Sequence, residues 1–509
     1  MTTNTTAETL ELIKGAQSSP DDLIKSFVQP GSATTGLQAY NLEGPSKKIF
    51  PILTPLRNMI GRSTGGFAIQ ANWKAITSIN AGNVRAGVSE GRRGGVITHS
   101  QSEYLAAFRG FGLENSVTFE AAYASKGYED VKALAVQSTL QATMIQEERL
   151  ILGGNTSLAL GTTPTPTLTA STTGGTLATQ TLSVICVALT LQAYLDVVGI
   201  NNGSIGDSVN LVAGVPGQIS RTNADVTTET FGGGNAQQSA NATISVTGAT
   251  GSATATVAAV RGAVGYAWYT GAAASERLYA VTSIPSVSIT AAAGGSNQLA
   301  SAIAGGAADR STSSLDFDGL LTMAFNPALN AYYYQMPGGT AGVGTGLTSD
   351  GAGGISEFEA AFVSFYNKYR LSPTHIFVSS QELINITKKI IGNSGAPLLK
   401  LNADVDSVVR GAVGGGVRVG SYLNKVLGVD VPLVTHPNLP AGTILFYSET
   451  LPYDASGIGA TARMLMRQDY YQLEWPLKSR KYEYGVYADG VLQHYAPFSM
   501  GVITGIGNA

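Results

Sequence analysis

An abrupt change of composition near residue 155 does most to limit how this chain of 509 residues can fold. From residue 155 to about 310, the sequence is rich in Ser, Thr, Ala and Gly, contains no lysine and shows short runs of alternating apolar and polar residues. Runs of this kind, separated by glycine-rich turns, are typical of a β-sandwich. We therefore expect an inserted all-β region between two regions of mixed structure.

The segment before this change, residues 128–152, is predicted to form one long helix. Its apolar residues recur at intervals of three, four and seven, and polar residues occupy the other faces. Gly153 and Gly154 then supply a C-terminal stop. At about 1.5 Å per residue this helix is roughly 37 Å long, which exceeds what a small domain needs. The expected apolar stripe consists of Ala133, Val136, Leu140, Met144 and Ile151.

Two extended runs upstream of the helix predict a long hairpin. Residues 67–73 alternate between apolar and polar positions, and a second run passes through Tyr104, Phe108 and Phe111. Between the runs lies a glycine-rich, charged tip at residues 87–95. A two-stranded hairpin has little core of its own, so we expect it to project and to need a partner.

The tip of the predicted hairpin supplies three candidate contact residues, Glu90, Arg92 and Arg93. One interpretation is that their charges are solvated and have no further role. The other is that the arginines pair with carboxylates of a neighbouring subunit, because so long a hairpin has few other sources of stability. The sequence leaves both interpretations open.

After residue 311 the pattern changes to mixed helix and strand. Capping boxes are expected at Ser356 with Glu359 and at Ser379 with Glu382, each at the start of a helix. The first of these helices carries an aromatic stripe, which predicts its buried face. The stripe consists of Phe358, Phe362, Phe365 and Tyr369.

The C-terminal part of the chain, residues 461–505, returns to long strands. Aromatic and polar residues alternate there, and Asp489-Gly490 predicts a hairpin turn. Together with the preceding helices and strands, this gives α+β as the predicted fold class of the chain.

Charge, cysteine content and hydropathy exclude several functions. The formal net charge is −3, and Lys and Arg form no run longer than two residues, so we expect no sequence-specific binding of nucleic acid. A single cysteine, Cys186, excludes an intrachain disulfide. The most apolar stretch, residues 182–200, is too polar to span a bilayer. The N-terminal residues lack the pattern of a secretory signal, so we expect a protein made in the cytoplasm.

Residues that could carry chemistry are scattered along the chain. The four histidines lie far apart in sequence, and none has another His or Cys at metal-ligand spacing. Cys186 lies in an apolar strand, where a thiol behaves as a small hydrophobic side chain. Residues 342–346 lack the ending of a phosphate-binding loop and predict a flexible loop. We therefore predict no catalytic residue, no cofactor and no metal, and a protein that is not an enzyme.

Four strings, in the order in which they occur, resemble one protein family. Residues 87–91 are similar to the tip of an extended loop, and residues 146–154 to the end of a spine helix, where acidic residues precede an apolar stretch and a glycine. Residues 432–446 resemble a strand pair of an axial domain, and residues 480–506 resemble closing peripheral strands. In this order they resemble the major capsid proteins of tailed bacteriophages (Caudoviricetes), which have the Hong Kong 97-type fold.

The resemblance implies a division of the chain into segments. Within the inserted sandwich, the aromatic pattern around Trp268 resembles the central strand of an immunoglobulin or fibronectin domain. The implied segments are an N-terminal arm (1–45), the start of the peripheral domain (46–64), an extended-loop hairpin (65–112), the peripheral domain with its spine helix (113–155), an inserted immunoglobulin-like β-sandwich (156–308), an axial domain (309–460) and the closing strands of the peripheral domain (461–509).

The function implied by the resemblance is structural. Copies would assemble into pentamers and hexamers that form the icosahedral head of the virion around double-stranded DNA, which is held without sequence specificity. The implied partners are scaffolding, portal and decoration proteins, with assembly in the host cytoplasm and no membrane. The alternative is an encapsulin-like nanocompartment shell, which has the same fold and encloses enzymes. A tail-tube protein or surface adhesin fits the long helix poorly, and a hydrolase lacks its catalytic residues.

Overall fold

The computed structural model describes residues 47–48, 52–80, 82, 84–198, 214–392, 418–453 and 456–508. The predicted N-terminal arm, residues 1–45, lies outside them. The chain divides into two units, one comprising Met1–Lys48 and Ser125–Asp130, the other Ile49–Ala124 and Val131–Ala509. In the first unit, the backbone N–H groups of Tyr128 and Glu129 donate to the carbonyl of Ser125. The helices and strands of the described residues belong to the second unit.

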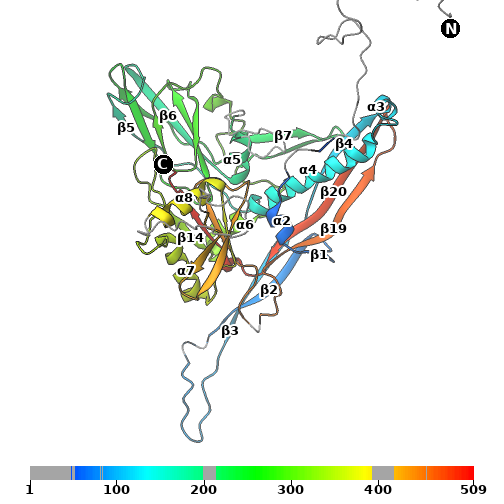
Figure 1. The fold of residues 1–509 in the computed structure, drawn as a ribbon, viewed down its shortest axis with the longest axis vertical. Helices are drawn as coiled ribbons and strands as arrows, with labels where there is room; N and C mark the ends of the chain where they lie inside the picture. The colour runs from blue at the N-terminus through cyan, green and yellow to red at the C-terminus, as the bar shows by residue number, and fades with distance from the viewer. Residues whose placement is uncertain are drawn as a thin grey trace, which may run out of the picture. The chain divides into compact units, whose positions relative to one another are not determined.

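A long helix, α4 (Val131–Gly153), packs along a four-stranded sheet in the second unit (Figure 1). The first strand of this sheet is parallel to its neighbour, and the other pairs are antiparallel. The predicted long helix is confirmed, although it begins at Val131 rather than at residue 128. The strand order of the sheet is β1 (Arg62–Thr64), β19 (Ala462–Glu474), β20 (Lys481–His494) and β4 (Arg109–Thr118).

The face that α4 buries differs from the predicted apolar stripe. Of that stripe only Ile151 is fully buried, and Ala133 is exposed. The buried positions in the middle of the helix are Ala135, Thr139 and Thr143 instead. Their small side chains let the helix lie close to the sheet, and each threonine hydroxyl donates to the backbone carbonyl four residues earlier, so both hydroxyls are paired. The prediction of the buried face was therefore wrong over the first half of the helix.

The turn predicted at Asp489-Gly490 is also wrong, because both residues lie inside β20. Gly490 pairs with Met466 of β19 on one side and with Arg109 of β4 on the other. The chain reverses between β19 and β20 at residues 475–480 instead. The sulfur of Met466 occupies the space where a side chain at position 490 would lie, so the glycine serves close packing rather than a turn.

A six-stranded sheet contains most of the later strands of the chain. Helices α7 (Ser356–Tyr369) and α8 (Ser380–Gly392) pack against it. The predicted aromatic stripe is confirmed at Phe358, Phe362 and Phe365, which are buried against Phe446. The strand order is β14 (Tyr332–Gln335), β21 (Gly501–Thr504), β18 (Ile444–Tyr447), β15 (His375–Val378), β17 (Val429–Thr435) and β16 (Ser421–Asn424).

The last strand of residues 461–509 lies in a different sheet from the two strands before it. β19 and β20 lie in the four-stranded sheet, but β21 pairs with β14 and β18 in the six-stranded sheet. Val502 and Ile503 are both buried, so both faces of β21 are covered, as in a central strand. The chain passes from one sheet to the other through a 3₁₀ turn at Pro497–Ser499.

Neither predicted capping box is complete. Only Ser379 acts as a cap, and the Glu382 carboxylate instead accepts a hydrogen bond from the backbone N–H of Gly442 (2.9 Å). The hydroxyl of Ser379 accepts a hydrogen bond from the backbone N–H of Glu382 (3.2 Å), as an N-cap residue does. Ser356 does not cap α7, because the N-cap position is Ile355 and no side chain makes a cap bond there. Glu359 instead accepts a hydrogen bond from the hydroxyl of Tyr422 in β16 (2.9 Å), so a tertiary partner displaces the local one.

Residues 156–308, which we call the inserted segment, contain two sheets that face each other. One has the order β13, β10, β5, and the other has the order β12, β11, β6, β9. The side chains buried between them include Cys186, Trp268 and Ile289. The strands are β5 (Thr167–Ser171), β6 (Gln180–Leu189), β9 (Ala242–Val246), β10 (Ser252–Thr256), β11 (Gly265–Gly271), β12 (Arg277–Thr282) and β13 (Ser286–Ile289).

The strands of the inserted segment pair within two separate sheets. Here β5 pairs with β10, while β6 pairs with β9 and β11. Trp268 does lie fully buried in β11, a strand with a neighbour on each side. The aromatic pattern therefore marked a buried strand, and the likeness to an immunoglobulin domain stays a prediction.

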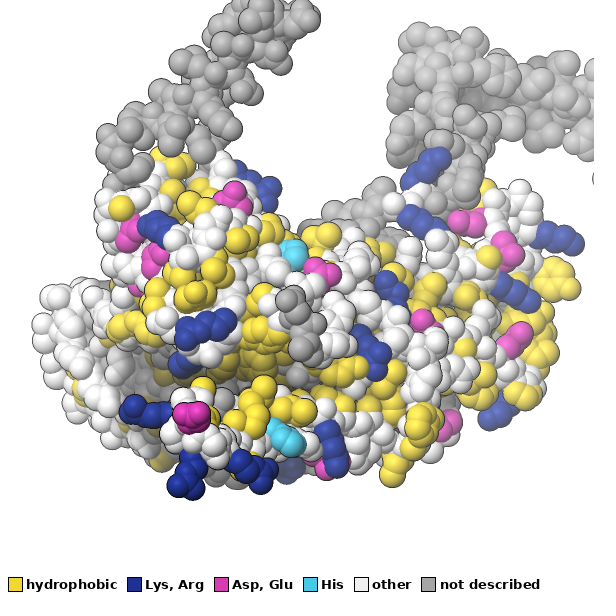
Figure 2. Space-filling view, turned by 90° about the horizontal axis from the view of Figure 1, so that it is seen from below, with side chains coloured by type: hydrophobic (Ala, Val, Ile, Leu, Met, Phe, Trp, Pro, Cys, Tyr) yellow, Lys and Arg dark blue, Asp and Glu magenta, His cyan; other side chains and the backbone are white. Residues whose placement is uncertain are grey.

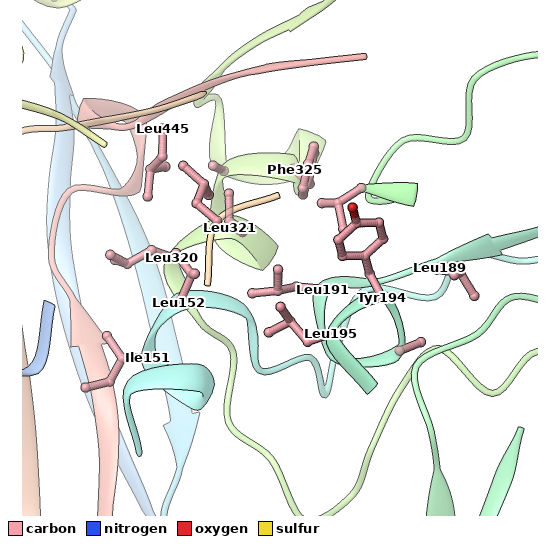
Figure 3. Packing of buried hydrophobic residues seen from close by; sticks show 14 of the residues in the cluster. Ile151, Leu152, Leu189, Leu191, Tyr194, Leu195, Leu320, Leu321, Phe325 and Leu445 are labelled. Atoms are coloured by element: carbon pink, nitrogen blue, oxygen red, sulfur yellow. The ribbon is translucent and has the colours of Figure 1, made fainter. Parts of the chain in front are cut away.

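The inserted segment shares one hydrophobic core with α4 and the four-stranded sheet. Leu191 of the inserted segment belongs to the same buried cluster as Leu152, at the end of α4 (Figure 3). A Cβ atom at Gly153 would lie 2.3 Å from Cδ2 of Leu191, so the helix end and the segment are in direct contact. The helices that contribute to this core include α4, α5 (Leu191–Val198) and α6 (Leu320–Phe325).

Several short elements complete the described part of the second unit. β7 (Gln218–Thr222) and β8 (Thr228–Gly232) pair with each other and with no other described strand. Within the described ranges, no helix has both the length and the hydropathy to span a membrane. The remaining helical elements are α2 (Pro55–Met59), α3 (Phe119–Ala124) and 3₁₀ turns at Ala300–Ala302 and Pro327–Leu329.

Candidate functional site

Two strands, β2 (Gln70–Ile79) and β3 (His99–Ala107), form an antiparallel hairpin that pairs with no other described strand. In Figure 1 the hairpin extends away from the four-stranded sheet. Residues 80–98, which include the predicted tip, connect its strands. The expected pairing of two extended runs is confirmed. Phe111, however, belongs to β4 and the four-stranded sheet, because that stretch pairs with β20 instead.

The hairpin and its root expose large apolar side chains. Phe67 is 80% exposed, Ile69 79% and Val96 86%. Full burial of one such side chain is worth about 1.5–3 kcal/mol relative to its exposed state. Covering these side chains would therefore add stability to the hairpin. Further exposed apolar side chains on the hairpin are Ile76, Ile79, Val88, Ile97 and Leu105.

The three candidate contact residues, Glu90, Arg92 and Arg93, are exposed in the connection between the strands. The backbone N–H of Arg92 donates to the carbonyl of Ser89 (3.1 Å), which closes a turn at the tip. In the described part of the chain, neither arginine forms an ion pair. Seen from the hairpin end, Lys and Arg side chains stand beside exposed apolar ones (Figure 2). The structure gives a second molecule access to these residues and leaves their partner open.

The root of the hairpin, in contrast to its far end, is packed into the rest of the unit. Trp73 of β2 stacks on Tyr104 of β3 with ring centroids 5.9 Å apart, and it meets Tyr495 edge-on at 6.1 Å. Phe108, between β3 and β4, is buried in the main core. The guanidinium of Arg467 lies 5.6 Å from the ring centroid of Phe108. These contacts fix the base from which the hairpin extends.

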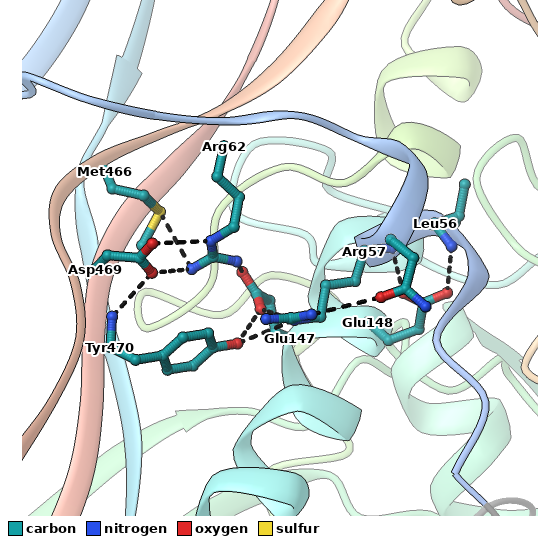
Figure 4. A network of polar contacts seen from close by, with 9 residues as sticks. Leu56, Arg57, Arg62, Glu147, Glu148, Met466, Asp469 and Tyr470 are labelled. Atoms are coloured by element: carbon teal, nitrogen blue, oxygen red, sulfur yellow. Dashed lines mark hydrogen bonds and ion pairs between the residues drawn. The ribbon is translucent and has the colours of Figure 1, made fainter.

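Glu148, near the C-terminal end of α4, joins three segments of the chain (Figure 4). Its carboxylate oxygens accept hydrogen bonds from the backbone N–H groups of Leu56 (2.9 Å) and Arg57 (2.7 Å), at the start of α2. Oε1 also accepts from Nε2 of His436 (2.7 Å), which directly follows β17. Because Nδ1 of His436 accepts from the N–H of Asn438 (3.1 Å), the ring proton lies on Nε2, facing Glu148.

Glu147, the preceding residue, binds three other side chains (Figure 4). It accepts hydrogen bonds from Nε of Arg57 (2.9 Å), from Arg62 of β1 and from the hydroxyl of Tyr470 in β19. Arg62 also pairs with Asp469 (2.5 Å), and its guanidinium lies 4.7 Å from the ring centroid of Tyr470. Two arginines thus face two carboxylates around one aromatic ring.

The environment of this network shifts the pKa values of its groups. Burial alone would raise the pKa of Asp469, but hydrogen bonds from Arg62 and from the backbone of Tyr470 outweigh it and lower the pKa. Burial, together with the charge of Glu147, raises the pKa of Tyr470 to about 12. Asp469 is therefore ionised and Tyr470 neutral near neutral pH.

The sequence alone did not reveal this network. It marked residues 146–154 only as similar to the end of a spine helix. The signal that was available is two adjacent acidic residues in the last turns of a helix, where the helix dipole disfavours negative charge. Their partners could not be read from the sequence, because Arg57 precedes Glu147 by 90 residues and Tyr470 follows it by 323.

Other groups that could carry chemistry lie in the interior. The thiol of Cys186 is fully buried, and burial raises its pKa well above the usual value. His494 is also buried, and burial lowers its pKa to about 3, so the ring is neutral at neutral pH. Within the described ranges, no group of three or more His, Cys, Asp or Glu side chains is arranged to hold a metal ion.

The glycine-rich loop at residues 342–346, expected to be flexible, joins two parts of the unit. The N–H of Gly342 donates to the hydroxyl of Ser286 in β13 (3.0 Å), and a Cβ at this glycine would overlap β13. Thr345 forms a parallel bridge with Ile506, just after β21. The expectation of a free loop was wrong, because the loop is bonded at both ends, and Gly342 and Gly344 combine close approach to other backbones with positive φ values of +79°.

A scan against protein-family models and a search of the curated proteins find no match to this sequence. Among solved structures, the capsid of Myoviridae phage XM1 aligns with 94% of this chain and 100% of its own, at 9% identity and a TM-score of 0.37. The mature capsid of bacteriophage PhiM1 aligns with 96% and 98%, at 8% identity and a TM-score of 0.38. An encapsulin complex from Synechococcus elongatus aligns with 92% and 94%, at 8% identity and a TM-score of 0.36. Because these TM-scores are low, we infer the function from the chain's own geometry.

Proposed function

We propose that this chain is the major capsid protein of a tailed bacteriophage, a shell subunit with the Hong Kong 97-type fold. In this proposal, α4 and the four-stranded sheet are the peripheral domain, and the six-stranded sheet with α7 and α8 is the axial domain. The β2–β3 hairpin is the extended loop, and the inserted segment is an added module. The protein acts through the geometry of its contacts and catalyses no reaction.

One observation carries the proposal: the apolar side chains of the hairpin have no cover in the described part of the chain. A two-stranded hairpin is at best marginally stable alone, and large exposed apolar patches mark interaction surfaces. Exposed apolar residues run from Phe67 at the root to Val96 in the connection, so the cover has to follow the whole hairpin. The low content of charged residues, 13%, suits a subunit whose surface is largely occupied by other copies.

A second copy of the chain is the partner that this surface fits. A hairpin of one copy that lies on a different surface of the next makes a heterologous contact, and such contacts close into rings when the rotation allows. Obligate contacts of this kind usually bury more than about 2,000 Å² in total. We propose that the rings are pentamers and hexamers and that they build an icosahedral head.

The tip residues Glu90, Arg92 and Arg93 then pair with charged groups of the neighbouring subunit. Exposed ion pairs are worth only about 0–1 kcal/mol each. Their role is accordingly to select the register of the contact, while the apolar residues of the hairpin supply its stability.

The remaining partners follow from the same proposal. The head encloses double-stranded DNA without sequence specificity, which agrees with a net charge of −3 and with the scarcity of Lys and Arg runs. Scaffolding, portal and decoration proteins assist assembly, which takes place in the host cytoplasm. We place the inserted segment on the outer face, where its surface, rich in Ser, Thr and Gly, suits a passive or weakly adhesive role.

Electron microscopy of purified particles, or of the protein expressed with its genomic neighbours, tests this function. DNA-filled icosahedral shells of pentamers and hexamers are the expected result. Small shells without DNA would instead identify a nanocompartment of the encapsulin type. Fibres, tubes or a stable monomer under all assembly conditions would contradict a shell subunit.

Truncation of the hairpin tests the observation that carries the proposal. Ile79 and His99 are paired, so residues 80–98 can be replaced by Asn-Gly, which closes a two-residue turn. The truncated subunit should fold with an unchanged melting temperature and fail to form shells. Normal shells from this variant would show that the hairpin's connection is not part of the contact.

The role of the tip charges has a matched control elsewhere in the chain. Arg92→Glu with Arg93→Glu should slow or misdirect assembly. Lys388→Glu with Lys389→Glu makes the same change of charge at an exposed pair in α8 and should have a smaller effect. Equal effects of the two double substitutions on assembly would mean that the tip arginines act only through the net charge of the subunit.

A further inference from the structure

Glu147 and Glu148 occupy a position that electrostatics disfavours. They lie in the last two turns of α4, where the end of the helix dipole carries partial negative charge. Both are fully buried. Buried ion pairs usually add little stability compared with apolar residues of similar size. Stabilisation of the fold is therefore a weak explanation for this pair, and the elements that the pair connects offer a better one.

The two glutamates connect the entry to the hairpin with both sheets. Glu148 binds the start of α2 and, through His436, the end of β17 in the six-stranded sheet. Glu147 binds Arg57 and Arg62, which belong to α2 and β1, and Tyr470 of β19 in the four-stranded sheet. Because α2 and β1 lead directly into β2, the start of the hairpin is attached to both sheets through two adjacent residues of α4.

We infer that Glu147 and Glu148 are positioning residues, which fix the direction in which the β2–β3 hairpin leaves the unit and tie that direction to the six-stranded sheet. The importance of this direction for assembly rests on the proposed function, in which the hairpin contacts a neighbouring copy. The pair acts through Arg57, Arg62 and His436.

The backbone between β1 and β2 supplies the bend that this network holds. Gly65 has φ +103°, and Ala68 has φ +60°, a left-handed conformation that is uncommon for a residue other than glycine. The guanidinium of Arg467 donates to the carbonyl of Ala68 (2.9 Å) and so supports the bend from β19. A fixed base at Arg62 and a bend a few residues later together set one exit direction.

The length of the hairpin makes this direction critical. At about 3.3 Å per residue, β2 spans roughly 33 Å, so a tilt of about 10° at its root moves its far end by roughly 6 Å. A displacement of that size exceeds the distance over which apolar side chains or ion pairs interact. Small losses of order at the base therefore translate into lost contacts at the tip.

The direction of the hairpin can be measured in the free, full-length subunit by pulsed electron resonance between two spin labels. Suitable positions are Gln101 on β3 and Gln137 on α4, both exposed and each replaced by cysteine. The natural Cys186 is fully buried and stays unlabelled in the folded chain. The wild-type background should give one narrow distribution of distances between the labels.

Glu148→Gln and Glu147→Gln test the inference without changing side-chain volume. In Glu148→Gln the new amide N–H₂ has to face an N–H donor, because both carboxylate oxygens accept hydrogen bonds. Each variant should broaden the distance distribution and shift it from the wild-type position. Glu357→Gln is the matched control, because Glu357 is a buried carboxylate that accepts the N–H of Thr348 (2.9 Å) outside the network. It should leave the distribution unchanged.

A second control separates positioning from general loss of stability. Val502→Ala opens a cavity in the six-stranded sheet and should lower the melting temperature without altering the distance distribution. Narrow, unshifted distributions in both glutamate variants, or equal broadening in Val502→Ala, would overturn the inference. The measurement does not depend on shell formation, so a subunit with a directed hairpin that never assembles would contradict the proposed function alone.

Discussion

The β2–β3 hairpin and the inserted segment are both β structures that depart from the main sheets, yet their apolar residues are treated in opposite ways. In the hairpin, Ile76 and Ile79 are mostly exposed. In the inserted segment, Trp268 is fully buried between the two sheets, and Tyr269 and Leu191 are buried in the core that the segment shares with the end of α4. Within the described part of the chain, the apolar residues of the hairpin therefore lack cover, whereas those of the inserted segment are covered by its own chain.

This difference shows that an insertion in the order of the chain need not be independent in space. The inserted segment is contacted by α4, by α6 and by the loop at residues 342–346, and all of them belong to the same compact unit. The hairpin is continuous with β4 and shares only its root with the core. Mutations and deletions should therefore affect folding at the inserted segment and association at the hairpin.

The largest effect is expected from removal of the inserted segment. Replacing residues 160–305 by a short Gly-Ser linker should leave an insoluble or unfolded protein, because the apolar faces of α4 and α6 that meet α5 lose their cover. Soluble yield and far-ultraviolet circular dichroism measure this outcome. If the protein without the segment were soluble and had the melting temperature of the full chain, the segment would be an independent module. The contrast with the hairpin would then fail.

Single substitutions should show the same contrast on a smaller scale. Leu191→Ala should lower the free energy of unfolding by about 2–5 kcal/mol, as expected for a buried leucine. Ile79→Ala, at an exposed position of the hairpin, should change it by less than about 0.5 kcal/mol in the free subunit. Urea denaturation followed by circular dichroism measures both. Similar losses at the two positions would mean that the hairpin is already covered within one chain.

Acid should destabilise the core beside the hairpin root. The hairpin should not contribute to this pH dependence. The folded pKa of His494 is about 3, below the ordinary 6.5, so the unfolded chain takes up the proton first as the pH falls. Its contribution to stability is complete above about pH 6.5 and decreases toward pH 3 by up to about 1.4 kcal/mol per pH unit. His494→Asn should flatten this dependence in urea titrations between pH 7 and 4.

The hairpin truncation provides the control for this pH dependence. A subunit in which Asn-Gly replaces residues 80–98 should keep the pH slope of the full chain, because no described group of that connection is buried. A slope that disappears with the truncation would place the responsible titration in the hairpin rather than in the core.

The smallest expected effect concerns two urea unfolding curves, one for labelling of Cys186 and one for the global transition, whose midpoints should coincide. Cys186 is fully buried in the inserted segment and should react with a thiol reagent only when that segment opens. If the segment shares its core with α4, the urea midpoint of thiol labelling should equal the midpoint of the global transition. Labelling at clearly lower urea would show that the segment unfolds on its own and would weaken the contrast with the hairpin.

Local patterns predicted those features whose cause is local. The helix at α4, the aromatic face of α7 and the cap at Ser379 depend on residues within a few positions of one another, so the sequence was sufficient. The hairpin was predicted for the same reason, since its two runs pair across one connection. The positions of Glu90, Arg92 and Arg93 at its tip followed directly.

Predictions failed where a distant segment decided the outcome. Asp489-Gly490 lies within a strand because β4 and β19 pair on its two sides. Glu359 leaves its expected capping role because Tyr422 lies beside it. In the same way, α4 buries a face with threonines because their hydroxyls bond within the helix and small side chains fit the sheet.

By itself, the sequence determined the α+β class, the long helix, an exposed hairpin with a charged tip and a β-rich middle, because each depends on composition and short-range periodicity. Only the tertiary structure decided that the inserted segment shares its core with α4, that β21 joins the six-stranded sheet, and that Glu147 and Glu148 meet Arg57, Arg62 and His436. These contacts join residues far apart along the chain. The residues next to a carboxylate or a leucine in the sequence do not indicate which distant residue it will contact in the folded chain.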